Sequence, residues 1–434
     1  MIKPQEFRKR RQQLLKTLGD GAIAIVPSAR EKVRNGDVHY PFRQDSDFWY
    51  LSGFSEPDAI LVLCHGCEVG EHILFCREAD PAKMIWDGPM LGTAGAREKL
   101  LFDAVYDIKA IDNIMPTLLK GRERICYPVG KDQAFDLKVL DWNKAVETRK
   151  GEKSQAPEKF TNVLHHLHDM RLYKSREEIR CMKKSAEIAV KAHQRMMQVV
   201  APGKNESDLL AEYLHTLASH QSQPSYTPII GGGANGCILH YVQNNQPLQD
   251  GDLVLVDAGA EYDLYASDIT RTYPVNGVFT SAQRDLYELV LTAHAAAVEH
   301  VQVGNQWNHP HEAAVRVIAQ GLIDLGLLQA PLEQVLEEEL YTEFFMHKTG
   351  HWLGLDVHDC GDYQVDGLWV ELEAGMVLTI EPGIYVSPQA PVQAHWKGMG
   401  IRIEDDVLVS RKGPQILSDK IPRDIDAIET LMRG

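Results

Sequence analysis

Short apolar runs, separated by Gly, Pro and charged residues, mark the expected strands of this chain. The clearest is Leu253–Val256, an unbroken run of Leu and Val that predicts a buried strand. It ends at Asp257, and Asp268 follows eleven residues later. If a hairpin turns between Tyr262 and Asp263, the two aspartates face each other at about 5 Å. Like charges that close require a proton or a cation between them, so the pair is either a metal site or two unrelated acids on a solvated turn.

The same pattern recurs 124 residues further along the chain, where Val377 corresponds to Leu253 and Glu381 corresponds to Asp257. A carboxylate at one point of two similar buried runs indicates a duplicated architecture that brings acids to one centre. The alternating segment Ile401–Glu404 predicts another strand, and Glu404 is the next available acid after Glu381. The expectation is four carboxylates on two hairpin-like pairs.

The N-terminal third reads as a separate α/β domain. Residues 1–20 have apolar side chains at helical spacing. Apolar runs predict strands at 22–27, 59–64 and 72–76. Alternation of strands and helices over residues 1–150 favours a domain of its own.

A charged stretch poor in apolar residues, 144–159, indicates a linker or a surface loop. We place the domain boundary near Met170, which gives an N-terminal domain of residues 1–170 and a catalytic domain of residues 171–434.

The C-terminal region reads twice as two helices followed by strands that carry acids. Its first helix begins at Ser175, which forms a capping box with Glu178, and its apolar stripe includes His193 as a packed histidine. Further helices are expected at residues 206–219, 281–302 and 310–327. The glycine-rich stretch 231–241 is read as a turn that feeds a short strand ending at His240, because no phosphate-loop motif is present. This order predicts a pseudo-duplicated α+β domain with the site between its halves.

Composition excludes several classes of function. The chain of 434 residues has a formal charge of −16, which argues against a nucleic-acid partner. No apolar run approaches the length of about 18 residues that indicates a membrane span, and no secretory signal is visible, so we expect a cytoplasmic protein. The seven cysteines suggest a reducing compartment. We read Cys64 and Cys67 as thiols near a strand end in preference to a zinc site, because no second C-x-x-C follows.

Three histidines, His347, His351 and His358, fall within twelve residues and lead towards Glu381. The zinc helix motif H-E-x-x-H is absent. Four carboxylates with an imidazole form an oxygen-rich set that favours Mn²⁺, Co²⁺ or Zn²⁺. The acids exceed the needs of one ion, which points to two ions about 3.5–4 Å apart.

The order Asp257, Asp268, His351, Glu381, Glu404 resembles the ligand set of the pita-bread metallopeptidases, which include methionine aminopeptidase, prolidase and aminopeptidase P. The stretches HWLGLDVHD (351–359), LTIEPGIY (378–385) and GIRIEDD (400–406) resemble aminopeptidase P most closely. The stretch 40–59 is similar to the N-terminal domain of that family. The resemblance covers nearly the whole chain and implies a pita-bread catalytic domain behind a smaller α/β domain.

The resemblance also implies roles for the ligands. Asp257 would chelate one ion, Asp268 and Glu404 would bridge two, and His351 and Glu381 would complete the other. Glu381 would act as general base on the bridging water and pass the proton to the leaving amine. Manganese is the expected metal.

Further family positions surround the substrate. His240 and His358 would hydrogen-bond the scissile carbonyl or the tetrahedral intermediate. We also expect them to end short strands at comparable places in the two halves. His347, Tyr385 and Arg402 match the proline-side pocket, although Arg402 is equally well read as a partner of a ligand carboxylate.

The activity implied is removal of the N-terminal residue from peptides with proline second, by a homotetramer or homodimer. The alternatives are an Xaa-Pro dipeptidase and a peptide-binding relative without catalysis. Two positions depart from the family pattern. Leu264 stands where glycine is usual, which affects the turn before Asp268, and Lys348 either alters substrate preference or points to solvent.

Overall fold

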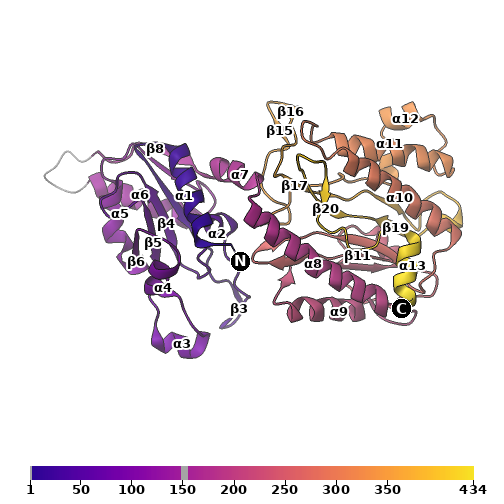
Figure 1. The fold of residues 1–434 in the computed structure, drawn as a ribbon, viewed down its shortest axis with the longest axis horizontal. Coiled ribbons are helices and arrows are strands. Elements are labelled where there is room, and N and C mark those ends of the chain that lie inside the picture. The colour runs from indigo at the N-terminus through magenta and orange to yellow at the C-terminus, as the bar shows by residue number, and fades with distance from the viewer. Residues whose placement is uncertain (1, 148–154) are drawn as a thin grey trace. The chain divides into compact units, whose positions relative to one another are not determined.

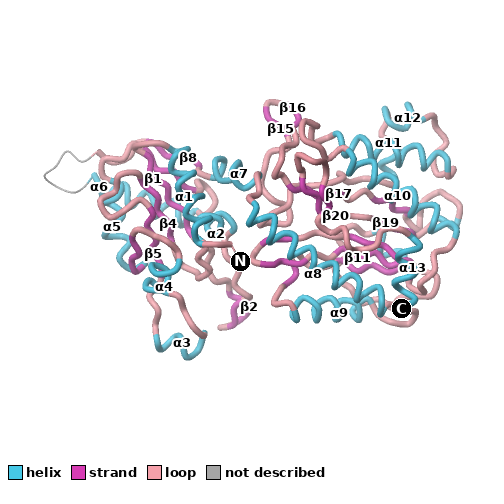
Figure 2. Tube along the Cα trace, in the orientation of Figure 1, coloured by secondary structure: helices cyan, strands magenta, loops and turns pink. Residues whose placement is uncertain are grey.

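The computed structural model describes residues 2–147 and 155–434. The chain forms two compact units, Met1–Arg171 and Leu172–Gly434. Figure 1 shows the elements of each unit, and Figure 2 shows that both units contain helices and strands. Part of the predicted linker lies outside the described residues. At its described ends, residues 144–147 are helical and Lys159 begins a strand.

The N-terminal unit is built on a six-stranded sheet in the order β6-β5-β4-β1-β7-β8. Strand β1 pairs antiparallel with β4 and parallel with β7, so the sheet is mixed. The six strands are β1 (Ala22–Pro27), β4 (Ile60–Cys64), β5 (His72–Cys76), β6 (Ala104–Asp107), β7 (Arg124–Tyr127) and β8 (Lys159–Asn162). The predicted strands at 22–27 and 72–76 are confirmed to the residue, and β4 begins one residue later than expected.

Helices surround this sheet, and a small hairpin lies outside it. The helices are α1 (Pro4–Leu18), α2 (Ser46–Ser52), α3 (Pro81–Asp87), α4 (Gly92–Lys99), α5 (Ile111–Leu119), α6 (Gln133–Glu147) and α7 (Leu164–Leu172), with a 3₁₀ turn at Ile108–Ala110. The hairpin pairs β2 (Val33–Asn35) with β3 (Val38–His39). The central strands β1, β4 and β5 are buried almost completely, which explains why they read as continuous apolar runs.

One expectation for this unit was wrong. Cys64 and Cys67 are joined by a disulfide and are not free thiols. Strand β4 ends at Cys64, and the turn that follows brings the two Cα atoms within 6.1 Å. This separation lies within the range that a disulfide spans.

The C-terminal unit begins with the capped helix that the sequence predicts. The Glu178 backbone N–H donates to Ser175 Oγ, and the Ser175 N–H donates to the Glu178 carboxylate at 2.9 Å. The helices are α8 (Arg176–Val199), α9 (Glu206–Ser219), α10 (Ser281–Glu299), α11 (His309–Asp324), α12 (Leu332–Glu337) and α13 (Ile425–Arg433), with 3₁₀ turns at Gly233–Cys237, Leu340–Glu343 and Ala394–Trp396. His193 is fully buried in α8, and its Nε2 donates to the Ala258 carbonyl at 2.9 Å.

The strands of this unit include two similar three-stranded groups, β10-β11-β14 and β17-β20-β21. A third three-stranded sheet, β13-β12-β9, and two hairpins, β15 with β16 and β18 with β19, complete the unit. The strands are β9 (Gln223–Pro224), β10 (Ile229–Gly232), β11 (Leu253–Asp257), β12 (Ala260–Tyr262), β13 (Tyr265–Ala266), β14 (Thr270–Pro274), β15 (Gln364–Val365), β16 (Leu368–Trp369), β17 (Val377–Ile380), β18 (Gly383–Val386), β19 (Met399–Arg402), β20 (Asp405–Leu408) and β21 (Gln415–Ile416). Helix α8 packs against β12 and β13, and α10 packs against β17, β18 and β19 (Figure 1).

The two groups meet where the Glu404 N–H donates to the Thr270 carbonyl at 3.1 Å. The predicted pseudo-duplication is visible in the strand starts, because β11 begins at Leu253 and β17 begins at the corresponding Val377. Side chains from both groups and from the helices of this unit form one large apolar core.

The register of the first group differs from the prediction. Asp257 pairs with Thr270, not with Asp268. The turn consists of Asp263 and Leu264, both with positive φ (54° and 64°), as in the two-residue hairpin turns whose twist matches that of the strands. The prediction placed the turn one residue too early, which shifts the pairing by two residues. A shift of two keeps side chains on their original face, so the aspartates still converge.

The segment Ile401–Glu404 is also not one alternating strand. Strand β19 ends at Arg402, and β20 begins at Asp405 after changing partner from β18 to β17. Both ladders share one register, in which Ile380 pairs with Asp405 and Gly383 pairs with Arg402. Glu404 therefore lies opposite Glu381.

No helix among the described residues is long and apolar enough to cross a membrane.

Candidate metal centre

The five predicted ligands come together at the junction of the two strand groups. Ligand atoms of Asp268, His351 and Glu404 all lie within 4.8 Å of one another. His351 Nε2 is 3.3 Å from Asp268 Oδ2 and 3.9 Å from Glu381 Oε1. Asp257 joins the group through the Tyr226 hydroxyl, which lies within hydrogen-bond distance of both aspartates, at 2.6 Å from Asp268 Oδ1.

The carboxylates of this cluster are poorly solvated. Glu404 is 2% exposed, Asp268 5% and Asp257 9%. Burial, followed by the neighbouring carboxylates, raises the pKa of Glu404 well above its ordinary value. Burial also raises the pKa of Glu381 to about 7. Buried acids that resist ionisation beside one another are the arrangement that a divalent cation stabilises.

The orientation of His351 fits a metal ligand. Its Nδ1 lies 2.9 Å from the Trp352 carbonyl, which can only accept, so Nδ1 carries the proton of the neutral ring. This leaves the Nε2 lone pair facing Asp268 and Glu381, as in most metal-binding histidines. Burial disfavours the charged ring, yet the hydrogen bond to Asp268 raises the pKa of His351 to about 9. A bound cation would replace that proton.

A strand-like segment holds His351 beside Glu381. The Thr349 carbonyl accepts the Glu381 N–H at 2.8 Å, and the His351 carbonyl accepts the Thr379 N–H at 3.0 Å. Gly350 permits this approach, because a Cβ atom there would stand 2.0 Å from the Thr379 carbonyl oxygen. The small residue between the two histidines is therefore required by the close backbone contact.

Arg402 contacts a predicted ligand directly. Its Nη2 donates to Asp257 Oδ2 at 2.6 Å, and its Nε donates to Thr270 Oγ1 at 3.1 Å. Its Nη1 donates to the Tyr385 hydroxyl at 2.9 Å. Of the two readings of Arg402, this geometry favours the partner of a ligand carboxylate.

The same hydroxyl extends the chain of hydrogen bonds to His347. His347 Nδ1 lies 2.8 Å from the Lys348 carbonyl and therefore donates, so Nε2 accepts from Tyr385 at 2.8 Å. Burial, followed by the charge of Arg402, lowers the pKa of His347 to about 4. The imidazole is thus neutral, and its tautomer is fixed.

His240 and His358 are exposed and lie in turns, so the expectation that they end matching strands was wrong. The reason is local, because 3₁₀ geometry over Gly233–Cys237 ends β10 before His240. His358 is nevertheless close to the centre, with its ring centroid 4.2 Å from that of His351. Burial and then His351 lower the pKa of His358, and the charge of His240 contributes to the same shift.

Sequence reasoning missed Tyr226, which precedes β10 in a loop without a recognisable motif. It also missed Arg271, whose guanidinium donates to the Glu404 carbonyl at 2.7 Å and to Asp405 Oδ1 at 2.8 Å. Arg271 is fully buried and links β14 to β20 beside the cluster. The sequence feature that could have identified Arg271 is its position directly after Thr270, at a polar strand end.

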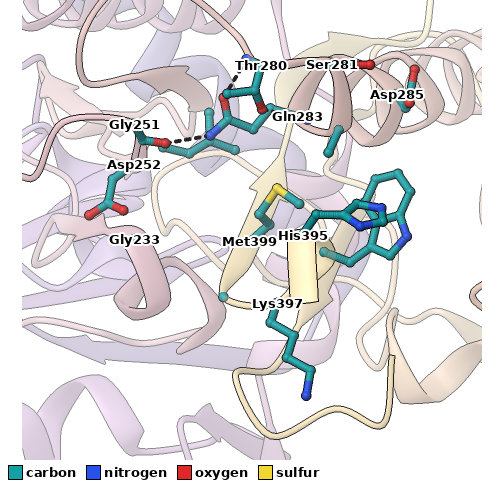
Figure 3. Close-up of a pocket in the computed structure, with 14 residues that line it drawn as sticks. Gly233, Gly251, Asp252, Thr280, Ser281, Gln283, Asp285, His395, Lys397 and Met399 are labelled. Carbon is teal, nitrogen blue, oxygen red and sulfur yellow. Dashed lines mark hydrogen bonds between the residues drawn. The ribbon is translucent and has the colours of Figure 1, made fainter. Parts of the chain in front are cut away.

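A separate cavity of about 610 Å³ lies between the start of α10 and the loop before β19 (Figure 3). Gln283 lines this cavity, accepting from the Thr280 N–H and donating to the Gly251 carbonyl. None of the five predicted ligands lines it. The cavity therefore does not compete with the acid cluster as the metal centre.

Comparison with known proteins agrees with this geometry. Residues 180–411 match the model of metallopeptidase family M24, and residues 7–127 match that of the aminopeptidase P N-terminal domain. The Xaa-Pro aminopeptidase of Haemophilus influenzae is 41% identical over 432 residues, which cover 99% of this chain and 97% of that protein. The chain belongs to metallopeptidase family M24.

Solved structures show the same fold. The Pseudomonas aeruginosa aminopeptidase PepP is 45% identical and superposes with a TM-score of 0.98, covering 100% of this chain and 98% of that one. A zinc-substituted Escherichia coli aminopeptidase P in complex with product is 40% identical, with a TM-score of 0.96 and coverage of 100% and 98%. The resemblance to aminopeptidase P and the pita-bread fold are confirmed. So is the assignment as an enzyme, a metal-dependent aminopeptidase.

Proposed function

We propose that this protein is an Xaa-Pro aminopeptidase, which hydrolyses the bond between the N-terminal residue of a peptide and a proline in second place. The observation that carries the proposal is the convergence of four carboxylates and His351 within the M24 portion of the chain. Full-length relatives named Xaa-Pro aminopeptidase support this substrate over that of an Xaa-Pro dipeptidase. The oxygen-rich ligand set also argues against a binding module that has lost catalysis.

The donor set suits two divalent cations, and manganese is our choice. Asp257 would chelate one ion, Asp268 and Glu404 would bridge both, and His351 and Glu381 would complete the second. Such ions supply Lewis acidity that polarises the scissile carbonyl and makes water more acidic. Arg402 and Tyr226, which contact Asp257, would fix the orientation of that carboxylate.

We assign proton transfer to Glu381. Burial raises the pKa of Glu381 to about 7, so this carboxylate takes up a proton more readily than a solvated glutamate does. Its carboxylate would take a proton from the attacking water and return it to the departing proline nitrogen. The neighbouring acids are held in place by hydrogen bonds, and we assign them no part in this proton transfer.

The histidines are assigned to the substrate. His358 is exposed with its ring next to that of His351, and His240 is exposed in the turn that follows Gly233–Cys237. Both would donate to the scissile carbonyl oxygen. Neutral His347, held by Tyr385, would present an uncharged edge to the proline ring. Lys348 is exposed, which supports the reading that it points to solvent.

We further propose a cytoplasmic homotetramer or homodimer. Support for assembly comes from helix α3, where Ile85 and Trp86 are 83% and 86% exposed. Large apolar side chains exposed side by side are typical of contact surfaces. Light scattering of the purified protein gives the mass directly, and a monomer at working concentration would contradict this part of the proposal.

Substrate length is the decisive test of the activity. The metal is first removed from the enzyme with a chelator, and Mn²⁺, Co²⁺ or Zn²⁺ is then added back. Each preparation is given Xaa-Pro-Yaa tripeptides, longer Xaa-Pro peptides and Xaa-Pro dipeptides. Release of the first residue from the tripeptides and longer chains is expected. Cleavage confined to dipeptides would favour the dipeptidase, and metal binding without any cleavage would favour the non-catalytic relative.

A further inference from the structure

A histidine outside the predicted site contacts the segment that presents His351. His311 lies in the first turn of α11 (His309–Asp324), and a hydrogen bond of 2.8 Å joins its Nδ1 to Thr349 Oγ1. Thr349 is 2% exposed, so its hydroxyl has little access to water as an alternative partner. A hydrogen bond between such groups is costly to lose, because a buried hydroxyl then remains unsatisfied.

The backbone of Thr349 is hydrogen-bonded to Glu381, the proposed base. Its carbonyl accepts the Glu381 N–H at 2.8 Å, the first bond between this segment and the chain beyond β17. The segment continues along β17 through His351 and Leu353, whose N–H donates to the Val377 carbonyl at 3.0 Å. The far end of the segment is also held by Trp352, which is fully buried. The near end, between Phe345 and Thr349, has no helical or strand structure.

Side-chain packing continues from His311 towards the proposed substrate side. Its ring lies 5.9 Å from that of Phe345, and Phe345 meets His347 edge-on at 5.0 Å. His311 therefore contacts both ends of the stretch 345–349, which carries His347 on one side and the Glu381 backbone bond on the other.

A cavity of about 60 Å³ adjoins this hydrogen bond and is lined by His311, Thr349 and Ile380, among others. A void beside the bond means that Thr349 has room to move once its partner is removed. Displacement of a catalytic group by about 1 Å is enough to reduce a rate about a hundredfold.

From this arrangement we propose that His311 is a positioning residue for Glu381. It acts through the Thr349 hydroxyl and backbone carbonyl, and it keeps the Glu381 carboxylate in its working place. This inference rests on the proposed role of Glu381 as the base.

The test compares His311→Ala, His311→Asn, Thr349→Val and Thr349→Ser in the metal-loaded full chain, on an Xaa-Pro-Yaa tripeptide. The Ala and Val variants each remove the bond and should lower kcat tenfold or more, with KM and metal content near those of the wild type. Asn and Ser restore a polar partner and should recover most of the rate. The double variant His311→Ala/Thr349→Val should be no slower than either single variant, because both remove one bond.

The Glu381→Gln background separates positioning from general loosening. Since the base is already absent there, His311→Ala should cause no further loss of rate. His300→Ala, an exposed histidine at the end of α10, is the matched control and should behave like the wild type. Equal losses in both backgrounds, or an unchanged kcat in His311→Ala, would overturn the inference.

A second measurement does not depend on catalysis. Amide hydrogen exchange at Glu381 reports its bond to the Thr349 carbonyl, and His311→Ala should speed that exchange about tenfold or more relative to His300→Ala. Unchanged exchange at Glu381 rejects the positioning role. If the wild type cleaves no Xaa-Pro peptide, the proposed function fails, whereas faster exchange would still establish that His311 positions Glu381.

Discussion

The two halves of the catalytic unit place an acid at the same point of the same strand and then give it different surroundings. Asp257 is the last residue of β11, and both of its carboxylate oxygens are engaged, by Tyr226 and by Arg402. Glu381 follows β17 with a longer side chain, and its oxygens lie 3.9 Å from His351 and from His347. The duplicated backbone thus supplies two equivalent positions. The neighbouring side chains hold the Asp257 carboxylate in place and leave the Glu381 carboxylate able to accept a proton.

The sharpest way to test this contrast is to remove one charge from each half. Glu381→Gln should lower kcat about a thousandfold or more while retaining the fold and much of the metal, because the amide cannot take a proton. Asp257→Asn should instead lose metal, since a proposed ligand that Tyr226 and Arg402 hold in place becomes neutral. Turnover and metal content by elemental analysis check both variants. Wild-type turnover in Glu381→Gln would remove Glu381 as the base.

The junction of the halves depends on Arg271. This fully buried guanidinium of β14 ties the Glu404 carbonyl and the Asp405 carboxylate of the other half. Arg271→Met would leave Asp405 without its main partner, and we expect a loss of about 3 kcal/mol or more in the free energy of unfolding. Denaturant titration measures it. The exposed pair Arg195–Glu212 provides the control, and Arg195→Met should change the unfolding midpoint little.

Each half also buries a histidine on its first helix, His193 in α8 and His294 in α10. Burial lowers the pKa of His193 to about 4, below the ordinary value of 6.5. The unfolded chain therefore binds more protons between these values, and stability falls as the pH drops from about 6.5 towards 4. From pH 7 to pH 5 the loss from His193 is about 2 kcal/mol.

His193→Gln retains a donor for the Ala258 carbonyl without a titrating ring, so its stability should depend less steeply on pH. Parallel denaturant titrations at pH 7 and pH 5 give the difference. Equal pH dependence in the two proteins would show that His193 is not kept neutral.

The smallest expected effect concerns the tight turn of the first half. Leu264 has a φ of 64°, a conformation that costs a residue with a Cβ about 1 kcal/mol or more. Leu264→Gly restores an Asp-Gly turn and should raise the free energy of unfolding by about 1 kcal/mol. Leu264→Ala retains the unfavourable φ and serves as the control. A gain in the alanine variant equal to that of glycine would contradict strain as the cause.

Much of the fold could be predicted because its signals are local. The capping box at Ser175, the strand at 22–27 and the repeated run at 253–256 and 377–380 depend on residues a few positions apart. The hairpin register failed by two residues because the turn was placed at Tyr262 and Asp263, whereas the left-handed pair is Asp263 and Leu264. An error of two residues leaves each side chain on the same face of the sheet, so the two aspartates were still expected to lie together.

The remaining errors and omissions involve partners that are distant in sequence or local geometry without a clear pattern. The disulfide at Cys64 depends on how tightly one turn closes, and the exposed placement of His240 depends on a 3₁₀ turn. Tyr226 and Arg271 carry no motif. Tyr226 contacts aspartates 31 and 42 residues further along the chain, and Arg271 reaches Asp405 across more than a hundred residues.

By itself, the sequence determined which segments become helices and strands and that two of the strands end in matching acids, since periodicity and capping act over single turns and neighbouring residues. Only the tertiary structure decided that Arg402 holds Asp257, that Tyr226 bridges the two aspartates and that His311 supports the segment beside Glu381. These contacts arise when separate elements pack. Their energies depend on burial and distance, which no local pattern specifies.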